Sequence, residues 1–166
     1  MRRHLRWDFP QTLQQDHPLG LELRPFELGD GPLIALGALF SRAYAGTIDD
    51  EGEGPAEAEA EVRGVISGRY GPLIREASGV LGSPDSPLAA SFVCEHRIGT
   101  IELPFLCYIV VEPDHQGRGL ARTLLMQTAR RLQAQGYSGL HLLVTLGNSP
   151  AERLYQRLGM IELARA

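Results

Sequence analysis

The stretch EPDHQGRGLARTLL, residues Glu112 to Leu125, decides the fold. It follows the apolar run LCYIVV, residues 106–111, and opens a segment with helical apolar spacing. Gly117 and Gly119 lie between the strand-like run and the helix-like run. A helix N-terminus presents about four unpaired amides and roughly half a positive charge, and glycines let the chain wrap these amides around an oxyanion. The stretch therefore predicts an anion site at a strand–helix junction.

The distribution of charge fits a negative ligand at this loop. The chain of 166 residues has 16 basic and 20 acidic side chains, and every basic one is arginine. Asp49–Glu61 contains seven acids and no base, whereas His115–Arg157 contains six arginines and one acid, Glu152. We expect the second half to suit a phosphate-bearing ligand. The acidic segment either attracts a cationic amine or forms a solvated face.

Other phosphate-binding loops do not fit the sequence. A P-loop requires Gly-Lys-Ser/Thr, and the chain contains no lysine. The dinucleotide fingerprint requires a third Gly or Ala where Arg122 stands. The acidic net charge of −4 and the lack of an aromatic-plus-basic platform argue against nucleic-acid binding. No apolar run approaches the ~18 residues of a membrane span, so we expect a cytoplasmic protein.

Hydrophobic periodicity and Gly/Pro punctuation predict a mixed α/β domain. We expect helices at 30–44, 55–68, 118–135 and 149–160, and strands at 21–28, 78–83, 88–96, 100–111 and 140–146. Ser149 is the expected N-cap of the last helix. Residues 1–18 are expected to be a flexible leader, and residues 19–166 a single domain. Cys94 and Cys107 form no metal-ligand pattern and are expected to be buried, reduced thiols.

QGRGLA at residues 116–121 and NSPAERLYQRLGM at residues 148–160 resemble two motifs of the GNAT superfamily of acyl-CoA-dependent N-acetyltransferases. QGRGLA, residues 116–121, resembles the Gln/Arg-x-x-Gly-x-Gly/Ala loop of the family. NSPAERLYQRLGM, residues 148–160, resembles the later Asn-x-x-Ala-x-x-Leu-Tyr-x-x-x-Gly-Phe element, with Met160 in place of the aromatic residue. The resemblance covers residues 103–160. It implies a GNAT-like mixed, mostly antiparallel twisted sheet flanked by helices.

The resemblance also implies a cofactor and its contacts. Acetyl-CoA, with no metal, is expected at a splay between two neighbouring central strands. The residues implied to bind it are Ile109, Val110, Val111, Gln116, Gly117, Arg118, Gly119, Leu120, Ala121, Asn148 and Ala151. Tyr155 is implied as the general acid that protonates the departing thiolate. The expected reaction is direct attack by a primary amine, and a homodimer is common in the family.

The general base and the acceptor amine stay open. Glu102 is the first candidate base, on the strand that the pattern predicts at 100–111. Glu95, His96 and His141 are further candidates, and water-relayed deprotonation of an already neutral amine is an equal alternative. The acceptor is a small molecule or a protein amine. The alternative function is a non-catalytic acyl-CoA-binding or regulatory module.

Overall fold

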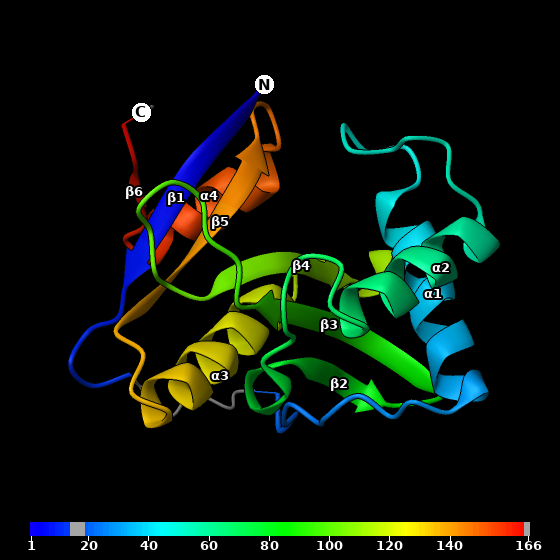
Figure 1. The fold of residues 1–166 in the computed structure, drawn as a ribbon. Helices are drawn as coiled ribbons and strands as arrows, with labels where there is room; N and C mark the ends of the chain where they lie inside the picture. Colours follow the sequence, from blue (N-terminus) through cyan, green and yellow to red (C-terminus); the bar gives the residue numbers. More distant parts are fainter. Residues whose placement is uncertain (14–18, 165–166) are drawn as a thin grey trace.

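The computed structural model describes residues 1–13 and 19–164, and it forms one twisted sheet with helices on both faces (Figure 1). The six strands lie in the order β2-β3-β4-β5-β1-β6. The strands are β1 Arg2–Asp8, β2 Gly79–Ser83, β3 Ser86–Cys94, β4 Phe105–Val111, β5 Gly139–Thr145 and β6 Ile161–Glu162. The helices are α1 Asp30–Tyr44, α2 Pro55–Ile66, α3 Leu120–Ala134 and α4 Ser149–Arg157, with short 3-10 turns at Arg75–Ala77 and Pro113–His115.

All neighbouring strands are antiparallel except β4 and β5, which run parallel. The chain makes that parallel connection through α3, because parallel neighbours require a long crossover. The prediction of a mixed, mostly antiparallel sheet flanked by helices is therefore confirmed.

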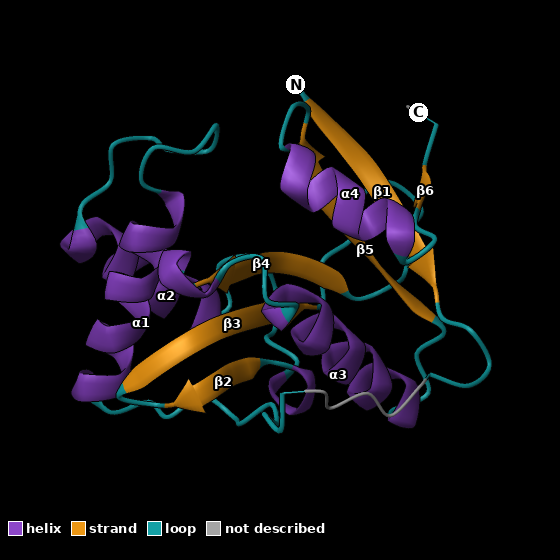
Figure 2. Cartoon of the chain, turned by 180° about the vertical axis from the view of Figure 1, so that it is seen from behind, coloured by secondary structure: helices purple, strands orange, loops and turns teal. Residues whose placement is uncertain are grey.

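The alternation of side chains along β3 separates the two faces of the sheet. Ala90, Phe92 and Cys94 pack against α1 and α2. Ala89 and Val93 point to the other face, where the α3 side chains lie. Seen from behind, α4 lies over β5 and β1 on the same side as α3 (Figure 2). The face of β5 and β1 that α4 leaves uncovered therefore looks towards α1 and α2.

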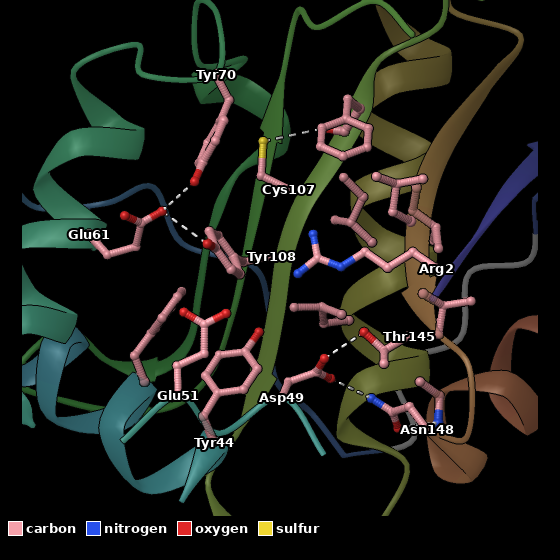
Figure 3. A pocket seen from close by; sticks show the side chains of 18 of the residues that line it. Arg2, Tyr44, Asp49, Glu51, Glu61, Tyr70, Cys107, Tyr108, Thr145 and Asn148 are labelled. Carbon is pink, nitrogen blue, oxygen red and sulfur yellow. Dashed lines mark hydrogen bonds between the residues drawn. The ribbon is translucent and has the colours of Figure 1, made fainter. Parts of the chain in front are cut away.

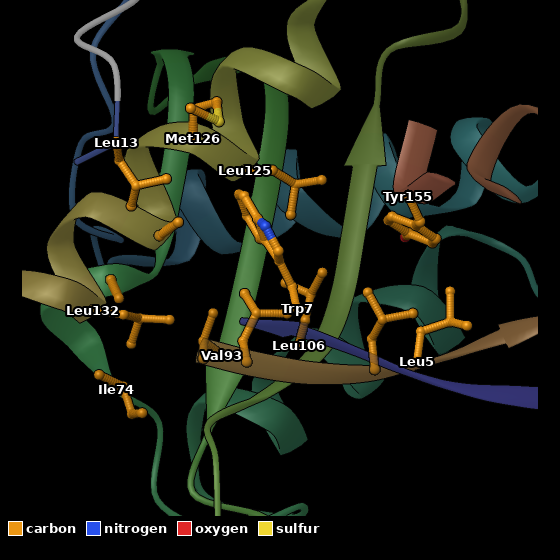
Figure 4. Packing of buried hydrophobic residues seen from close by; sticks show 14 of the residues in the cluster. Leu5, Trp7, Leu13, Ile74, Val93, Leu106, Leu125, Met126, Leu132 and Tyr155 are labelled. Atoms are coloured by element: carbon orange, nitrogen blue, oxygen red, sulfur yellow. The ribbon is translucent and has the colours of Figure 1, made fainter. Parts of the chain in front are cut away.

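The main core joins β1 and β5 to α3 and α4 (Figure 4). Trp7 is 2% exposed and belongs to the same buried cluster as Leu106, Leu125 and Tyr155. Burying apolar area stabilises a fold by roughly 25 cal/mol per Å², so these large side chains contribute strongly. The core fixes α4, and with it Tyr155, onto the sheet.

The N-terminal prediction is wrong for Arg2–Asp8. These residues form β1, which lies between β5 and β6 and is paired with β5 along its whole length. Leu5 and Trp7 alternate with polar residues and enter the core, a period-two signal that the arginine-rich composition obscured. The remainder of the expected leader includes residues 14–18, which lie outside the described residues.

The strand expected at 21–28 does not form and the strand expected at 100–111 is shorter than predicted, and proline is the cause in both. Residues 21–28 make only an isolated bridge, Arg24 to Val80, because Pro25 has no backbone N–H to donate. β4 begins at Phe105 and not at residue 100, because Pro104 interrupts the ladder. The helices at 30–44 and 149–157 begin where the sequence predicts them to begin.

Candidate functional site

β4 and β5 separate soon after they meet. Their ladder consists of two pairs, Phe105 with His141 and Leu106 with Leu142. On its other side β4 stays paired with β3 as far as Val111. The β5-facing edge of residues 109–111 therefore has no strand of the described chain on it. This gap is the splay that the sequence predicted.

The glycine loop lies at the end of β4 and forms part of the wall of a cavity of about 780 Å³. Gly119 is the N-cap of α3 with φ 80°, and Gly117 has φ 76°. Both conformations are in the left-handed region that side chains avoid. A Cβ at either position would meet no atom within 4 Å. The space beside these amides is therefore open to a ligand.

Other side chains at this cavity suit a polar, negative ligand. Arg122, Arg153 and Arg157 line it. His115 also lines it, and its Nδ1 is buried with no hydrogen-bond partner among the described residues. Gln116 lies at the entrance and donates from Nε2 to the Val111 carbonyl, 3.3 Å away.

The structure brings most of the predicted cofactor residues together around this cavity. They are Ile109, Val110, Val111, Gln116, Gly117, Gly119, Ala121, Asn148 and Ala151. Leu120 instead packs into the core beside Leu124. Arg118 is exposed and lies outside the described lining of the cavity.

Both predicted polar residues of the second motif lie at α4, Asn148 before its first residue and Tyr155 near its end. Asn148, and not Ser149, is the N-cap, and its Oδ1 accepts from the Ala151 amide at 3.4 Å. Tyr155 lies two turns later and is 6% exposed. Burial raises the pKa of Tyr155 above its ordinary value, and the nearby Asp49 carboxylate raises it further by a smaller amount. Tyr155 is therefore a protonated hydroxyl at neutral pH, as a general acid requires.

A second cavity of about 500 Å³ lies on the other side of the splay (Figure 3). Its acidic lining residues come from the loop after α1 and from α2, and they are Asp49, Asp50, Glu51, Glu53 and Glu61. Arg2 from β1 is the basic side chain among its described lining residues. The acidic segment therefore forms a wall of this cavity.

Glu61 organises the aromatic floor of this acidic cavity. Its Oε1 accepts hydrogen bonds from the hydroxyls of Tyr70 at 2.8 Å and Tyr108 at 2.9 Å. Its Oε2 contacts Arg69. Burial, together with the hydrogen bonds of its neighbours, raises the pKa of Tyr108. The floor is thus a set of neutral phenols around one carboxylate.

The two cavities meet at the splay. Six residues line both, namely Tyr44, Asp49, Ile109, Asn148, Ala151 and Tyr155. A ligand in one cavity can therefore reach a ligand in the other at this point. The general acid predicted from the sequence is one of the six.

The structure places Glu102 away from this junction. It lies before β4, is exposed, and pairs with Arg97 at 3.1 Å. The expectation that Glu102 lies on the central strand is wrong, because Pro104 delays the start of that strand. Neither cavity has Glu102 among its described lining residues.

The other candidate bases are differently placed. Glu95 is exposed and lies outside the described lining of both cavities, whereas His96 lines the acidic cavity. His141 is fully buried, and its Nε2 lies 3.0 Å from the His96 carbonyl. Since a carbonyl only accepts, Nε2 carries the proton and Nδ1 accepts from His4 Nε2 at 2.8 Å. Burial lowers the pKa of His141, so it is a neutral structural residue.

Sequence reasoning missed Arg2 as a cavity residue and did not single out Asp49 within the acidic segment. Asp49 Oδ1 accepts from Thr145 Oγ1 at 2.6 Å, and Asp49 Oδ2 accepts from Asn148 Nδ2 at 3.2 Å. These contacts join residues nearly a hundred positions apart, and local spacing carries no signal for them. Predicting Arg2 as a cavity residue would have required recognition of β1 as a strand between β5 and β6.

The cysteines lie on adjacent strands with their Sγ atoms 2.6 Å apart, and both are free. Cys94 is buried as expected, whereas Cys107 is half-buried and lines the acidic cavity. Within residues 1–13 and 19–164, no group of three or more His, Cys, Asp or Glu side chains could hold a metal ion. No helix in those ranges is long and apolar enough to cross a membrane.

Comparison with known proteins supports the motifs and the fold. Residues 86–160 match the acetyltransferase (GNAT) family. A mycothiol acetyltransferase of Actinosynnema mirum is 45% identical over 53 residues, which cover 31% of this chain and 18% of that protein. The matched segment thus spans about a fifth of the length of that relative.

Two solved structures share the fold. PH1933 of Pyrococcus horikoshii has a TM-score of 0.72 and 18% identity, covering 88% of this chain and 92% of that one. AAC(6')-Iy, in complex with the bisubstrate analogue CoA-S-monomethyl-acetylneamine, has a TM-score of 0.62 and 17% identity, covering 88% and 94%. At such identities the likeness establishes the fold alone.

Proposed function

On the premise that residues 86–160 belong to the acetyltransferase (GNAT) family, we propose that the chain transfers an acetyl group from acetyl-CoA to a primary amine. One observation carries the proposal. A cavity with arginines and open helix amides meets a cavity with carboxylates, and the buried hydroxyl-bearing residue Tyr155 lies where they join. An anionic acyl donor and a cationic acceptor would each find the complementary charge.

The cavity at the glycine loop fits the pyrophosphate and the arm of coenzyme A. The amides at Gly117 and Gly119 offer donors without a side chain in the way. Arg153 and Arg157 add positive charge to the same wall. The free edge of Ile109–Val111 would pair with the amides of the arm as an added strand does.

The acetyl group would then lie at the junction of the two cavities. A backbone N–H on the free edge of β4 would stabilise the negative oxygen that develops on the attacked carbonyl. Tyr155 would give its proton to the sulfur as the carbon–sulfur bond breaks. Ala151 is small, so it leaves room for the donor to reach this point.

The acceptor would enter through the acidic cavity and attack directly, without a covalent enzyme intermediate. The carboxylates at Asp49, Glu51 and Glu53 favour a cationic amine. A role of Glu102 as base stays a prediction that its exposed position does not support. The segment matched to an acetyltransferase and the fold of an aminoglycoside-analogue complex support this reaction class.

Thiol release from acetyl-CoA tests the proposal. The purified protein is incubated with acetyl-CoA and separate amines: 1,4-diaminobutane, an unblocked peptide and an aminoglycoside. At least one primary amine should accelerate free-thiol release, and its N-permethylated counterpart should not. Binding of acetyl-CoA without turnover of any amine would favour the non-catalytic acyl-CoA-binding module instead.

A further inference from the structure

We infer that the Asp49 carboxylate receives the acceptor ammonium and takes its proton, so that Asp49 and Tyr155 form the base and acid of the site. This inference rests on the proposed acetyl transfer and names a residue that sequence analysis left unassigned. Three observations carry it: the position of Asp49, its spare hydrogen-bonding capacity and its proximity to Tyr155.

Asp49 is the acid of its loop that reaches across to the sheet (Figure 3). It is half-buried, whereas the neighbouring Asp50, Glu51 and Glu53 are exposed. Thr145 at the end of β5 and Asn148 at the start of α4 hold its two oxygens. Among the described acids, Asp49 alone lines both cavities.

The hydrogen bonds of Asp49 leave room for a substrate. An ionised carboxylate can accept about four hydrogen bonds. Among the described residues, each oxygen of Asp49 accepts one side-chain hydrogen bond, and these two bonds fix the orientation of the carboxylate. Each oxygen therefore keeps capacity for an N–H donor of the acceptor.

The other fixed carboxylates of the cavity have structural partners. Glu61 accepts two tyrosine hydroxyls on Oε1 and contacts Arg69 through Oε2. Asp50 accepts the amides of Gly46 at 2.7 Å and Gly52 at 2.8 Å, which shapes the loop. Asp49 is the carboxylate held by Thr145 and Asn148, and Asn148 also lines the cofactor cavity.

The neighbourhood of Asp49 and Tyr155 suits an acid and a base at one point. The Asp49 carboxylate is near enough to raise the pKa of both Tyr155 and Tyr44. Asp49 can take a proton from the acceptor ammonium, and the neutral phenol of Tyr155 can give a proton to the departing sulfur. Paired titratable residues divide acid and base roles in the same way in other active sites.

The proton balance closes over one turnover. The acceptor R–NH₃⁺ gives one proton to Asp49, and the neutral amine attacks the thioester carbonyl to form the carbon–nitrogen bond. The carbon–sulfur bond breaks, and Tyr155 protonates the thiolate. Tyr155 recovers its proton from the nitrogen as the amide forms, and Asp49 releases its proton to water. The products are the acetylated amine, free coenzyme A and one proton.

Asp49→Asn tests the inference, because it keeps the shape and an oxygen acceptor but removes the charge and the base. With 1,4-diaminobutane, whose amines are protonated at physiological pH, we expect kcat/KM to fall about 100-fold or more. With hydroxylamine, which is neutral at physiological pH, we expect a fall of less than about fivefold. The acetyl-CoA affinity measured by calorimetry should change less than about threefold, which reports an intact fold.

Glu57→Gln is the matched control, because it removes one negative charge from the exposed first turn of α2, outside the described lining of both cavities. It should behave as the unsubstituted protein with both amines. If Asp49→Asn lowers kcat/KM equally for the two amines, the inference is overturned, and Asp49 has only a structural role in holding Thr145 and Asn148. Unchanged turnover of the diamine would overturn it as well. If the unsubstituted protein acetylates none of the amines, the proposed function fails and takes this inference with it.

Discussion

The two cavities that meet at the splay are assembled in opposite ways. The cofactor cavity is built mostly from two local stretches, residues 109–122 and 147–157, and residues 43–49 at the end of α1 and in the loop after it complete the lining. The acidic cavity takes Arg2 from β1, Asp49 from a loop, Glu61 from α2 and His96 from another loop. A site made of local backbone can be predicted from spacing, whereas a site made of distant side chains requires the fold.

The contrast predicts that substitutions at the two cavities and at their junction separate catalysis from binding. Substitution of Asp49 or Tyr155 at the junction should affect turnover and leave the acetyl-CoA affinity nearly unchanged. The cofactor wall should affect acetyl-CoA affinity alone. Protonation of His4 on β1 and His141 on β5 should affect the stability of the fold alone.

Tyr155→Phe should give the largest effect. The ring stays in the core and only the hydroxyl is lost, so we expect kcat to fall about 10²-fold or more while acetyl-CoA affinity stays unchanged. The rate of thiol release measures kcat, and calorimetry measures the acetyl-CoA affinity. Unchanged kcat would exclude Tyr155 as the general acid. Binding of acetyl-CoA without any turnover by the unsubstituted protein would favour a binding module instead.

The pH profile of turnover by the unsubstituted protein sharpens this assignment. The pKa of Tyr155 is raised above the ordinary 10.0, so its proton is present at neutral pH and is lost only above that value. We therefore expect no alkaline fall of kcat from Tyr155 below about pH 10. A fall near neutral pH that Tyr155→Phe abolishes would contradict the raised pKa.

The double substitution Arg153→Gln, Arg157→Gln should have an intermediate effect. Both side chains are exposed on the cofactor wall, so we expect the Kd for acetyl-CoA to rise about 3- to 10-fold. The effect should weaken at high salt because exposed charges are screened. Arg75→Gln is the control, because Arg75 is exposed and lies outside the described lining of both cavities. It should change neither the Kd for acetyl-CoA nor the salt dependence of that Kd. A rise in the KM for the amine without a change in Kd would break the assignment of the two cavities.

The smallest expected effect is the change in stability with pH that His4 of β1 and His141 of β5 cause. Burial lowers the pKa of His4 and His141, so folding favours their neutral forms. The unfolded chain binds more protons below its pKa of 6.5, and stability is therefore lost as pH falls through and below that value. Thermal unfolding at about pH 7.5 and about pH 5.5 should show a lower midpoint at the acid value. A midpoint that rises on acidification would contradict the buried neutral pair.

The sequence predicted most of the fold and one half of the site. Helix starts at Asp30 and Pro55 and the glycine loop are local signals, and they appear where they were expected. β1 was missed because its two apolar residues are embedded among arginines. Asp49 could not be distinguished from six other acids of its segment, because only the folded chain brings it to Thr145 and Asn148.

The central claim is that the loop before α3 holds the acyl donor, and calorimetric titration with acetyl-CoA tests it most directly. The unsubstituted protein should bind, and Gly119→Glu should weaken binding about 100-fold or more because it places a negative charge at the N-terminus of α3. Gly136→Glu is the control, since Gly136 has φ 92° and an equally open Cβ position beyond the far end of α3. It should carry similar backbone strain and bind acetyl-CoA normally. Equal binding by all three proteins, or no binding by any, would contradict the account.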